Sequence, residues 1–293
     1  MEFHQLQYFL AVARTGNFSR AAEQCHVAQP SLSQQIQKLE EELGETLFVR
    51  RGRTSSLTPH GEALLPRAAR ILEEAEAARR EVTETRGLER GTINFGALPT
   101  IAPYFLPTAL AEFRRSYPGV TVLIQEDTTA RLLDLATSFA LDFAILATAE
   151  NDERLDGRVL LSDALLLALP EDHRLVKKRG ITAADIRGEP LIMMKEGHCL
   201  GDQTLDFCAQ RDIRPSIGFR SAQIETIREL VRAGLGLALI PAMAAERDTD
   251  GRGIVYRAFS KPAPSRKIVA VWPKSRPPQG AAAEFLKLLG RAS

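Results

Sequence analysis

Residues 17–44 read NFSRAAEQCHVAQPSLSQQIQKLEEELG, and they contain the most informative pattern in the front of the chain. Ser19 is placed to cap a short helix that buries Ala21 and Cys25. A tight turn follows, and Pro30 then stands in the first turn of another helix, a position that proline favours. The stretch therefore predicts two short helices joined by a turn.

The later of these helices has two unlike faces. Leu32, Ile36 and Leu39 line an apolar face. The opposite face is polar and carries Ser31, Ser33, Gln34, Gln37 and Lys38. Amide and hydroxyl groups can read base edges in the major groove of DNA, and lysine can hold phosphate. This pattern is typical of a helix-turn-helix, although a small helical bundle with a solvated polar face would also produce it.

Two flanking segments extend this domain. An amphipathic helix over residues 3–15 precedes it, and an extended basic segment over residues 47–58 fits a wing that touches DNA. The candidate DNA contacts are polar or basic residues, together with the proline at the start of the later helix: Arg20, Gln29, Pro30, Ser31, Ser33, Gln34, Lys38, Arg50, Arg51 and Arg53. We therefore assign residues 1–58 to a winged helix-turn-helix.

Residues 59–90 form a long stretch rich in Ala, Glu, Arg and Leu. We expect Thr58 to cap this helix, Pro59 to lie in its first turn, and Pro66 to kink it. An alternating spacing of three and four residues indicates a heptad seam of Leu65, Ala68, Leu72, Ala75, Arg79 and Val82, in which Arg79 fits poorly. Such a helix either packs on its own domain or, as we expect, dimerises.

Composition excludes several classes of protein. The 293 residues are 44 % hydrophobic and 26 % charged with a formal net charge of +1, which suits about two soluble domains. We expect neither a signal peptide nor a membrane span. Three scattered cysteines are not a disulfide framework, and without a CxxC or HxxxH spacing we predict no metal site. We also expect no cofactor.

From Thr92 onward, strand-like and helix-like segments alternate, which predicts an α/β fold with parallel strands. Ligands of such folds sit at the carboxyl ends of the strands, near helix N-termini. Thr100 and Thr129 occupy such positions. The chain crosses twice between two subdomains, of which we expect the first at about 91–162 and 267–293 and the second at about 163–266.

The segment from Lys195 to Cys208 carries reactive groups. His198 adjoins Cys199, and residues 203–208 suggest a helix after that cysteine. If residues 199–208 were all helical, nine steps of about 1.5 Å would separate the two Cα atoms by roughly 13 Å, whereas a disulfide tolerates less than about 7 Å. Joining the cysteines would require the helix to melt, so their oxidation would be a conformational switch. Alternatively, both are packing residues, as Cys25 is expected to be.

The front third closely resembles the N-terminal domain of LysR-type transcriptional regulators. The resemblance rests on LQYF at 6–9, NFSRAA at 17–22, VAQPSLS at 27–33, LEEELG at 39–44 and LTPHG at 57–61. It implies an α winged helix-turn-helix at 1–58, a dimerising linker helix at 59–90, and at 91–293 an α/β effector domain of two subdomains built like a periplasmic binding protein. Ala28 departs from the Ser or Thr of many members, which leaves the later helix without a side-chain cap.

The remainder resembles the peroxide-sensing members of this family. The matching residues include LPT at 98–100, GHCL at 197–200, DQ at 202–203 and FC at 207–208. The resemblance implies that Cys199 is the peroxidatic cysteine and Cys208 the resolving one, which join in a reversible disulfide. It further implies that the peroxide-binding groups are Thr100, Thr129, His198, Cys199 and Arg266, of which Arg266 favours the thiolate.

The resulting expectation is a cytoplasmic regulator rather than an enzyme. Its expected partners are double-stranded DNA, hydrogen peroxide, further copies of itself in a homodimer or homotetramer, and RNA polymerase, without a membrane. One competitor is a regulator of this family whose cleft binds a small organic effector and whose cysteines are incidental. Others are a thiol peroxidase, which the DNA-binding front end disfavours, and a DNA-compacting protein.

Overall fold

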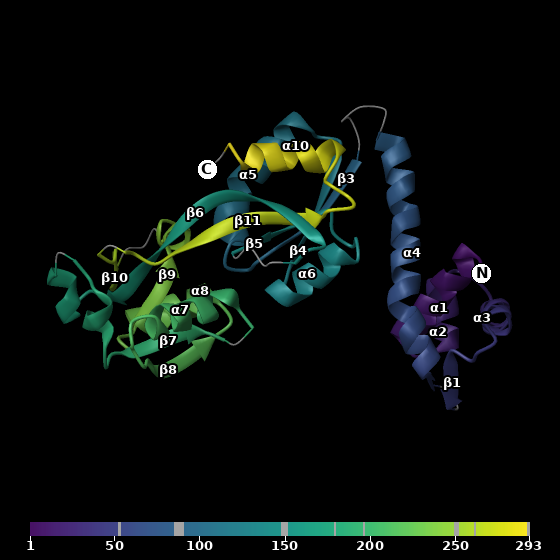
Figure 1. The fold of residues 1–293 in the computed structure, drawn as a ribbon, viewed down its shortest axis with the longest axis horizontal. Helices are drawn as coiled ribbons and strands as arrows, with labels where there is room; N and C mark the ends of the chain where they lie inside the picture. The colour runs from purple at the N-terminus through teal and green to yellow at the C-terminus, as the bar shows by residue number, and fades with distance from the viewer. Residues whose placement is uncertain are drawn as a thin grey trace. The chain divides into compact units, whose positions relative to one another are not determined.

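The computed structural model describes residues 1–51, 54–84, 91–147, 152–178, 180–195, 197–248, 252–260 and 262–291. The chain divides into two compact units, Met1–Thr85 and Arg86–Ser293, which are described separately (Figure 1). The first unit has one hydrophobic core, whereas the second has two. No helix in the described ranges is long and apolar enough to cross a membrane.

The first unit contains helices and one hairpin. Its elements are α1 (Phe3–Thr15), α2 (Phe18–Gln24), α3 (Gln29–Leu43), β1 (Phe48–Arg51), β2 (Thr54–Leu57) and α4 (Pro59–Glu84). Phe9, Leu32 and Ile36 are fully buried in its core because the apolar positions of α1 and α3 recur at helical spacing. The predicted helix-turn-helix and the extended wing are confirmed by these elements.

Two details of the turn differ from prediction. Asn17 rather than Ser19 caps α2, because its Oδ1 accepts from the N–H groups of Ser19 at 2.8 Å and Arg20 at 3.0 Å. An oxygen one residue before the helix reaches these donors, whereas Ser19 already lies inside the first turn. Cys25 is the C-cap residue and only half-buried, although it packs against the core of this unit.

The helix α4 begins as predicted. The Thr58 hydroxyl accepts from the Gly61 N–H at 3.0 Å and so caps it. On the expected seam, Ala68 is fully buried in the core of its own unit, and Leu65 and Leu72 pack against that core. The first half of the seam is therefore used within the unit. The side chains of Arg79 and Val82 lie outside the described ones, so the rest of the seam stays a prediction.

The second unit contains a sheet with the strand order β10-β6-β11-β5-β3-β4, and β9 pairs with β6. The elements of its first part are β3 (Gly91–Ala97), α5 (Ala102–Ser116), β4 (Val120–Glu126), α6 (Thr129–Thr137), β5 (Phe143–Leu146), β6 (Leu155–Pro170), β11 (Ser265–Pro273) and α10 (Gly280–Leu289). In Figure 1, α5 and α10 cover one face of this sheet and α6 covers the other. The core between them is built around Phe95, Phe143 and Phe285.

The other part of the second unit surrounds a separate core. Its elements are the short 3-10 helices η1 (Arg174–Lys177) and η2 (Ala183–Ile186), then β7 (Pro190–Met194), α7 (Cys199–Ala209), β8 (Ser216–Ser221), α8 (Ile224–Arg232), β9 (Ala238–Pro241), α9 (Ala242–Ala245) and β10 (Ile254–Arg257). The strands β7 and β8 pair in parallel, and α7 and α8 pack on β7.

The sheet is mixed rather than parallel throughout. β3 pairs in parallel with β4 and β5, as predicted, but β11 is antiparallel to both β5 and β6. β6 begins ten residues before the strand expected at 165–169 and runs from one part of the unit into the other, as β11 does (Figure 1). The two crossings are therefore neighbouring strands, and their facing residues near positions 163 and 266 lie between the stretches that enter the two cores.

Candidate functional site

The redox-active segment predicted from the sequence lies at the start of α7. Gly197 has φ +86°, a conformation that residues with a side chain rarely adopt, and it turns the chain into the helix. His198 is the N-cap residue, although its side chain does not cap the helix. The helix begins at Cys199 and not near residue 203 as predicted, so both cysteines belong to it.

The two cysteines lie in different cores. Cys199 is 9 % exposed and packs in the core of the first part of the unit, whereas Cys208 is fully buried in the other core. Both thiols are free. Because nine helical steps of about 1.5 Å separate their Cα atoms by roughly 13 Å, this arrangement is a reduced form in which no disulfide can close without a change in α7.

Opposing influences act on the Cys199 thiol. Burial raises its pKa, while the Arg266 guanidinium and the Thr129 hydroxyl counter that rise and the Asp202 carboxylate adds to it. Thr129 is the first residue of α6 and is buried. Its Oγ1 interacts with the Cys199 thiol and has no other hydrogen-bond partner among the described residues, so it is able to bond a small polar molecule beside the thiol.

Arg266 and Thr100 are in direct contact. The Arg266 Nη1 donates to the Thr100 hydroxyl at 3.0 Å, and Nη2 donates to the Thr100 carbonyl at 2.9 Å. Both residues are 2 % exposed. The Arg266 Nε donates to Oδ2 of Asp163 at 2.9 Å, an ion pair that the sequence analysis did not single out. A buried cation is thus held between the two crossing strands and the residues leading into α5.

Several contacts anchor α7 in its helical state. The Gln203 Nε2 donates to the Ala147 carbonyl at 3.1 Å and so connects α7 to the end of β5. The Phe207 ring packs edge-on against Phe259 at 4.9 Å between centroids. The Arg211 guanidinium lies over the Phe207 ring, 4.2 Å from its centroid. These contacts hold Cys208 in its core.

A cavity of about 560 Å³ adjoins α7 and the start of β11. Its lining is polar in part and contains both the buried Arg266 and side chains of the helix, with Ala147, Leu165, Gln203, Asp206, Phe207, Gln210, Arg211, Ala263, Pro264, Ser265, Arg266 and Lys267. Its volume suits a small molecule. Across the described ranges, no cluster of three or more His, Cys, Asp or Glu side chains could hold a metal ion.

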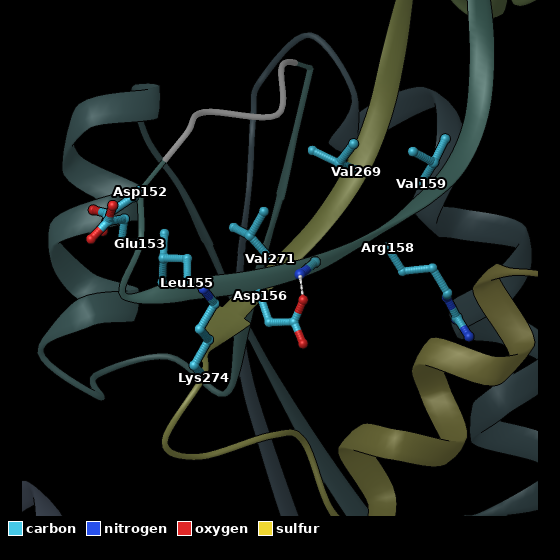
Figure 2. Close-up of a pocket in the computed structure, with 10 residues that line it drawn as sticks. Asp152, Glu153, Leu155, Asp156, Arg158, Val159, Val269, Val271 and Lys274 are labelled. Atoms are coloured by element: carbon cyan, nitrogen blue, oxygen red, sulfur yellow. Dashed lines mark hydrogen bonds between the residues drawn. The ribbon is translucent and has the colours of Figure 1, made fainter.

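Figure 2 shows a second hollow, of about 530 Å³, over the start of β6 and the end of β11. Val269 and Val271 line it from β11, and the charged side chains of Asp152, Glu153 and Lys274 surround it. Neither a thiol nor a histidine belongs to its lining. The chemistry expected from the sequence is therefore concentrated at α7.

The candidate DNA contacts are on the surface of the first unit. Arg20 on α2 is exposed. Of the candidate contacts on α3, Ser33 is half-buried and the others are exposed, namely Gln29, Pro30, Ser31, Gln34 and Lys38. Ala28, the N-cap residue of α3, provides no side-chain hydrogen bond, so backbone N–H groups at this helix end remain available to a phosphate. Leu32, Ile36 and Leu39 on the opposite face are fully buried.

The wing is the hairpin of β1 and β2. Arg50 faces Ser55 and Arg51 faces Thr54 in its register, which brings both arginine positions to the end of the hairpin. The side chains of Arg50 and Arg51 are outside the described ones, and Arg53 lies outside the described residues altogether. Their contacts with DNA stay predictions.

Sequence reasoning missed the groups that position the expected ones. Asp163 is a charged residue between the apolar segments 159–161 and 165–169, which was its only signal. Its partner Arg266 lies 103 positions later, so the pairing requires the strand register. The Tyr104 hydroxyl donates to Glu225 at 2.6 Å and connects α5 to α8, which is also a contact between the two parts of the unit.

Comparison with family models matches both units. Residues 3–62 match the model described as the bacterial regulatory helix-turn-helix protein of the lysR family, and residues 86–293 match the LysR substrate binding domain. Among curated proteins, the DNA-binding transcriptional dual regulator OxyR of Escherichia coli strain K12 is 35 % identical over 277 residues, which cover 94 % of this chain and 91 % of that protein.

Two solved structures are similar over nearly the whole chain. Full-length OxyR from Pseudomonas aeruginosa, with a cysteine changed to aspartate, has a TM-score of 0.78 at 30 % identity and covers 100 % of this chain and 94 % of its own. A cysteine-to-serine mutant of Corynebacterium glutamicum OxyR, in its hydrogen-peroxide-bound form, has a TM-score of 0.67 at 30 % identity and covers 99 % and 92 %. The fold predicted from the sequence is thereby confirmed.

Proposed function

Since the chain belongs to the LysR family of bacterial transcriptional regulators, we propose that it senses hydrogen peroxide through a reversible Cys199–Cys208 disulfide and thereby switches transcription of oxidative-stress genes. Members of this family are regulators of transcription and not enzymes. The similarity to OxyR proteins, one of them bound to hydrogen peroxide, supports the choice of stimulus. The observation that carries the proposal is the position of two free cysteines at opposite ends of one helix, each in its own core.

The first chemical step occurs at Cys199. Its thiolate attacks one oxygen of the peroxide, the O–O bond breaks, and the products are a sulfenic acid and hydroxide, which takes up a proton to become water. Sulfur is oxidised by two electrons and the peroxide is reduced. Arg266 favours the thiolate, and the hydroxyls of Thr100 and Thr129 and the side chain of His198 would orient the peroxide.

The second step joins the two cysteines. The Cys208 thiolate attacks the sulfenic sulfur, and the hydroxyl leaves as water with the proton that Cys208 gave up. Because the sulfurs start in different cores, α7 must unwind between them. The Gln203 anchor to Ala147 and the packing of Phe207 on Phe259 would be lost in the process. The disulfide form therefore has a different surface around α7, which is the change that we propose the regulator transmits.

Double-stranded DNA is the proposed partner of the first unit. In the proposed complex α3 enters the major groove and the basic wing contacts the DNA backbone, through the ten candidate side chains named above. A regulator of transcription acts where DNA and RNA polymerase are, so we assign it to the bacterial cytoplasm and propose RNA polymerase as a further partner.

We also propose a homotetramer built from dimers. Exposed apolar side chains in the second unit support self-association: Leu123 and Ile124 on the edge strand β4 are 51 % and 42 % exposed, and Phe219 on β8 is 43 % exposed. Apolar side chains on a sheet edge are a ready pairing surface. Two-fold symmetric dimers would match palindromic half-sites on DNA.

A second candidate function is sensing of a small organic effector. The observation in its favour is the cavity of about 560 Å³ beside α7, whose lining includes Arg211 and Lys267 as cations. In that case a metabolite with an anionic group would stabilise one arrangement of the two parts, and the cysteines would be packing residues.

Exchange of Cys199 for serine separates the two candidates. Cys199→Ser should leave DNA binding intact and abolish the change in footprint or in transcription that peroxide causes. Cys25→Ser, which alters a half-buried thiol outside the second unit, is the matched control and should respond like the parent protein. A Cys199→Ser protein that still responded to peroxide would remove the thiol from the mechanism.

A further inference from the structure

Asp163 and Arg266 form a charged pair between the two crossing strands. They are direct partners in the antiparallel register of β6 and β11. The Asp163 side chain is 3 % exposed and that of Arg266 is 0 % exposed. A buried ion pair at this depth seldom improves stability over a well-packed apolar pair, so its presence at a site calls for another explanation.

Both carboxylate oxygens of Asp163 are occupied. Oδ2 accepts from Arg266 Nε at 2.9 Å, and Oδ1 accepts from the Met243 backbone N–H at 3.2 Å. Met243 is in α9, and its side chain packs against both cores of the unit. Each oxygen of Asp163 is therefore bonded to a donor on a different element, and rotation of the carboxylate would break both bonds.

The rest of the guanidinium is fixed by Thr100. A guanidinium has five N–H donors in one plane. With Nε on Asp163, the Arg266 Nη1 reaches the Thr100 hydroxyl and Nη2 the Thr100 carbonyl, while Nη2 also lies 3.7 Å from the Met243 sulfur. Four of the five donors are thus directed at protein atoms. The guanidinium is rigid and planar, so a rotation that breaks the bond from Nε to Asp163 would also break both bonds to Thr100. The bond to Asp163 therefore helps to fix the plane of the whole group.

The charges around the thiol come from few groups. Arg266 on β11 lowers the pKa of Cys199, and Asp202 on α7 raises it, while burial is the largest influence and raises it. Burial lowers the pKa of Arg266, and Asp163 is the strongest opposing influence, with smaller ones from Cys199 and Tyr104. The arginine stays charged with or without this carboxylate, whereas the negative charge of Asp163 opposes a second anion nearby. The position of the guanidinium and the charge of the carboxylate consequently have opposite effects on the thiolate.

We propose that Asp163 is a positioning residue for the reaction at Cys199: it holds the Arg266 guanidinium in the orientation that contacts Thr100, from which the cation favours the thiolate. The inference rests on the proposed function of Cys199 as the peroxide-reactive group. In this role the length of the Asp163 side chain matters, because it determines where the guanidinium lies. The negative charge of Asp163, by contrast, disfavours the Cys199 thiolate.

Two substitutions separate geometry from charge. Asp163→Asn keeps the length of the side chain and an oxygen that can accept from Arg266 Nε, but it removes the charge and also the bond that Oδ1 accepts from the Met243 N–H, because the amide nitrogen is a donor. Asp163→Glu keeps the charge and adds a methylene, which displaces the guanidinium from Thr100 in a closely packed site. Both are made in the full chain carrying Cys208→Ser, so that only the first step is measured, and thermal unfolding confirms that each variant is folded.

The readouts are the rate at which hydrogen peroxide converts Cys199 to a trapped sulfenic acid, and the pH midpoint of its alkylation by iodoacetamide. We expect Asp163→Asn to react within about threefold of the parent with a midpoint at lower pH, because a negative charge has been removed. We expect Asp163→Glu to react at least about tenfold more slowly with a midpoint at higher pH, a difference of one pK unit or more.

The opposite order would overturn the inference, since a slow Asn variant beside a normal Glu variant means that charge alone matters. Equal rates and equal midpoints in all three proteins would overturn it too, and would make the pair structural. Failure of the proposed function gives a different result. In that case the parent protein would not react with peroxide at all, while the alkylation midpoints would still report on Asp163.

Discussion

At the scale of residues, Arg266 determines how reactive Cys199 is at neutral pH. The thiolate is the nucleophile, so below the pKa of the thiol the rate rises about tenfold per pH unit. Burial raises that pKa and Arg266 lowers it. Removal of the cation therefore raises the pKa further and moves the whole rate profile to higher pH. Arg266→Ala should slow peroxide oxidation at pH 7 by about tenfold or more, measured as loss of free thiol against time.

The control for this prediction is another cation of the same unit. Lys274→Ala removes an exposed lysine from the hollow of Figure 2 and should leave the rate unchanged. Because Arg266→Ala leaves Asp163 buried without its partner, which costs about 3–5 kcal/mol, thermal unfolding must accompany the kinetics. If the Arg266→Ala protein is folded and its oxidation rate depends on pH as in the parent protein, Arg266 contributes to stability and not to the reactivity of the thiol.

Base recognition also belongs to this scale. Gln29→Ala and Ser33→Ala should each weaken specific DNA binding by about 1–3 kcal/mol, since each removes a group able to read a base edge. Affinity is measured at one fixed salt concentration on a duplex selected by the protein. Gln279→Ala, an exposed glutamine outside the first unit, should bind like the parent. If neither α3 variant differs from this control, the helix is not the reader.

At the scale of elements, α7 sets the free-energy difference between the reduced and oxidised forms. Its helix must unwind before the two sulfurs meet, so a weaker helix should favour the disulfide. Asp206 is an exposed residue in the middle of α7. Asp206→Gly and Asp206→Ala differ by about 1 kcal/mol in helix propensity, which corresponds to about 20 mV. The glycine variant should have the more negative reduction potential, measured by equilibration with glutathione.

A matched pair of glycine and alanine variants on another helix tests whether the change in reduction potential is specific to α7. Glu112 is an exposed residue of α5, which keeps its structure in both redox forms under this account. Glu112→Gly and Glu112→Ala should differ in thermal stability but not in potential. Equal potentials for the two Asp206 variants would mean that α7 stays helical when the sensor is oxidised.

At the scale of the whole molecule, self-association should depend on the edge of the sheet in the second unit. Leu123→Asp places a charge among the exposed apolar side chains of β4 and should shift sedimentation toward smaller species. Val159→Asp is the control, because Val159 is 53 % exposed on β6 away from β4 in the strand order. Equal shifts in both variants, or none in either, would exclude β4 as the interface.

The sequence predicted local structure well because local signals determine it. The spacing of Leu32, Ile36 and Leu39 was sufficient for α3, and Thr58 for the start of α4. The cap of α2 was misjudged by two residues because Asn17 and Ser19 are both good caps. The expected helix after Cys199 began too late, since Cys199, Gly201 and Asp202 have weak helical propensity, whereas the burial of Cys199, Leu200 and Gly201 stabilises the first turn.

Features that depend on distant contacts were not accessible from the sequence. The strands β6 and β11 are about a hundred residues apart in the sequence, and only their pairing in the sheet places Asp163 opposite Arg266. The same holds for the assignment of Cys199 and Cys208 to different cores. The residue types that carry the chemistry could be named in advance, whereas the partners that position them required the fold.

Non-reducing peptide mass spectrometry on protein exposed to equimolar hydrogen peroxide is the decisive experiment for the proposed disulfide switch. We expect a fast Cys199–Cys208 linkage that dithiothreitol reverses, with Cys25 still free. Two free thiols at positions 199 and 208 after that treatment would contradict it, and the cavity beside α7 would then become the place to look for an organic effector.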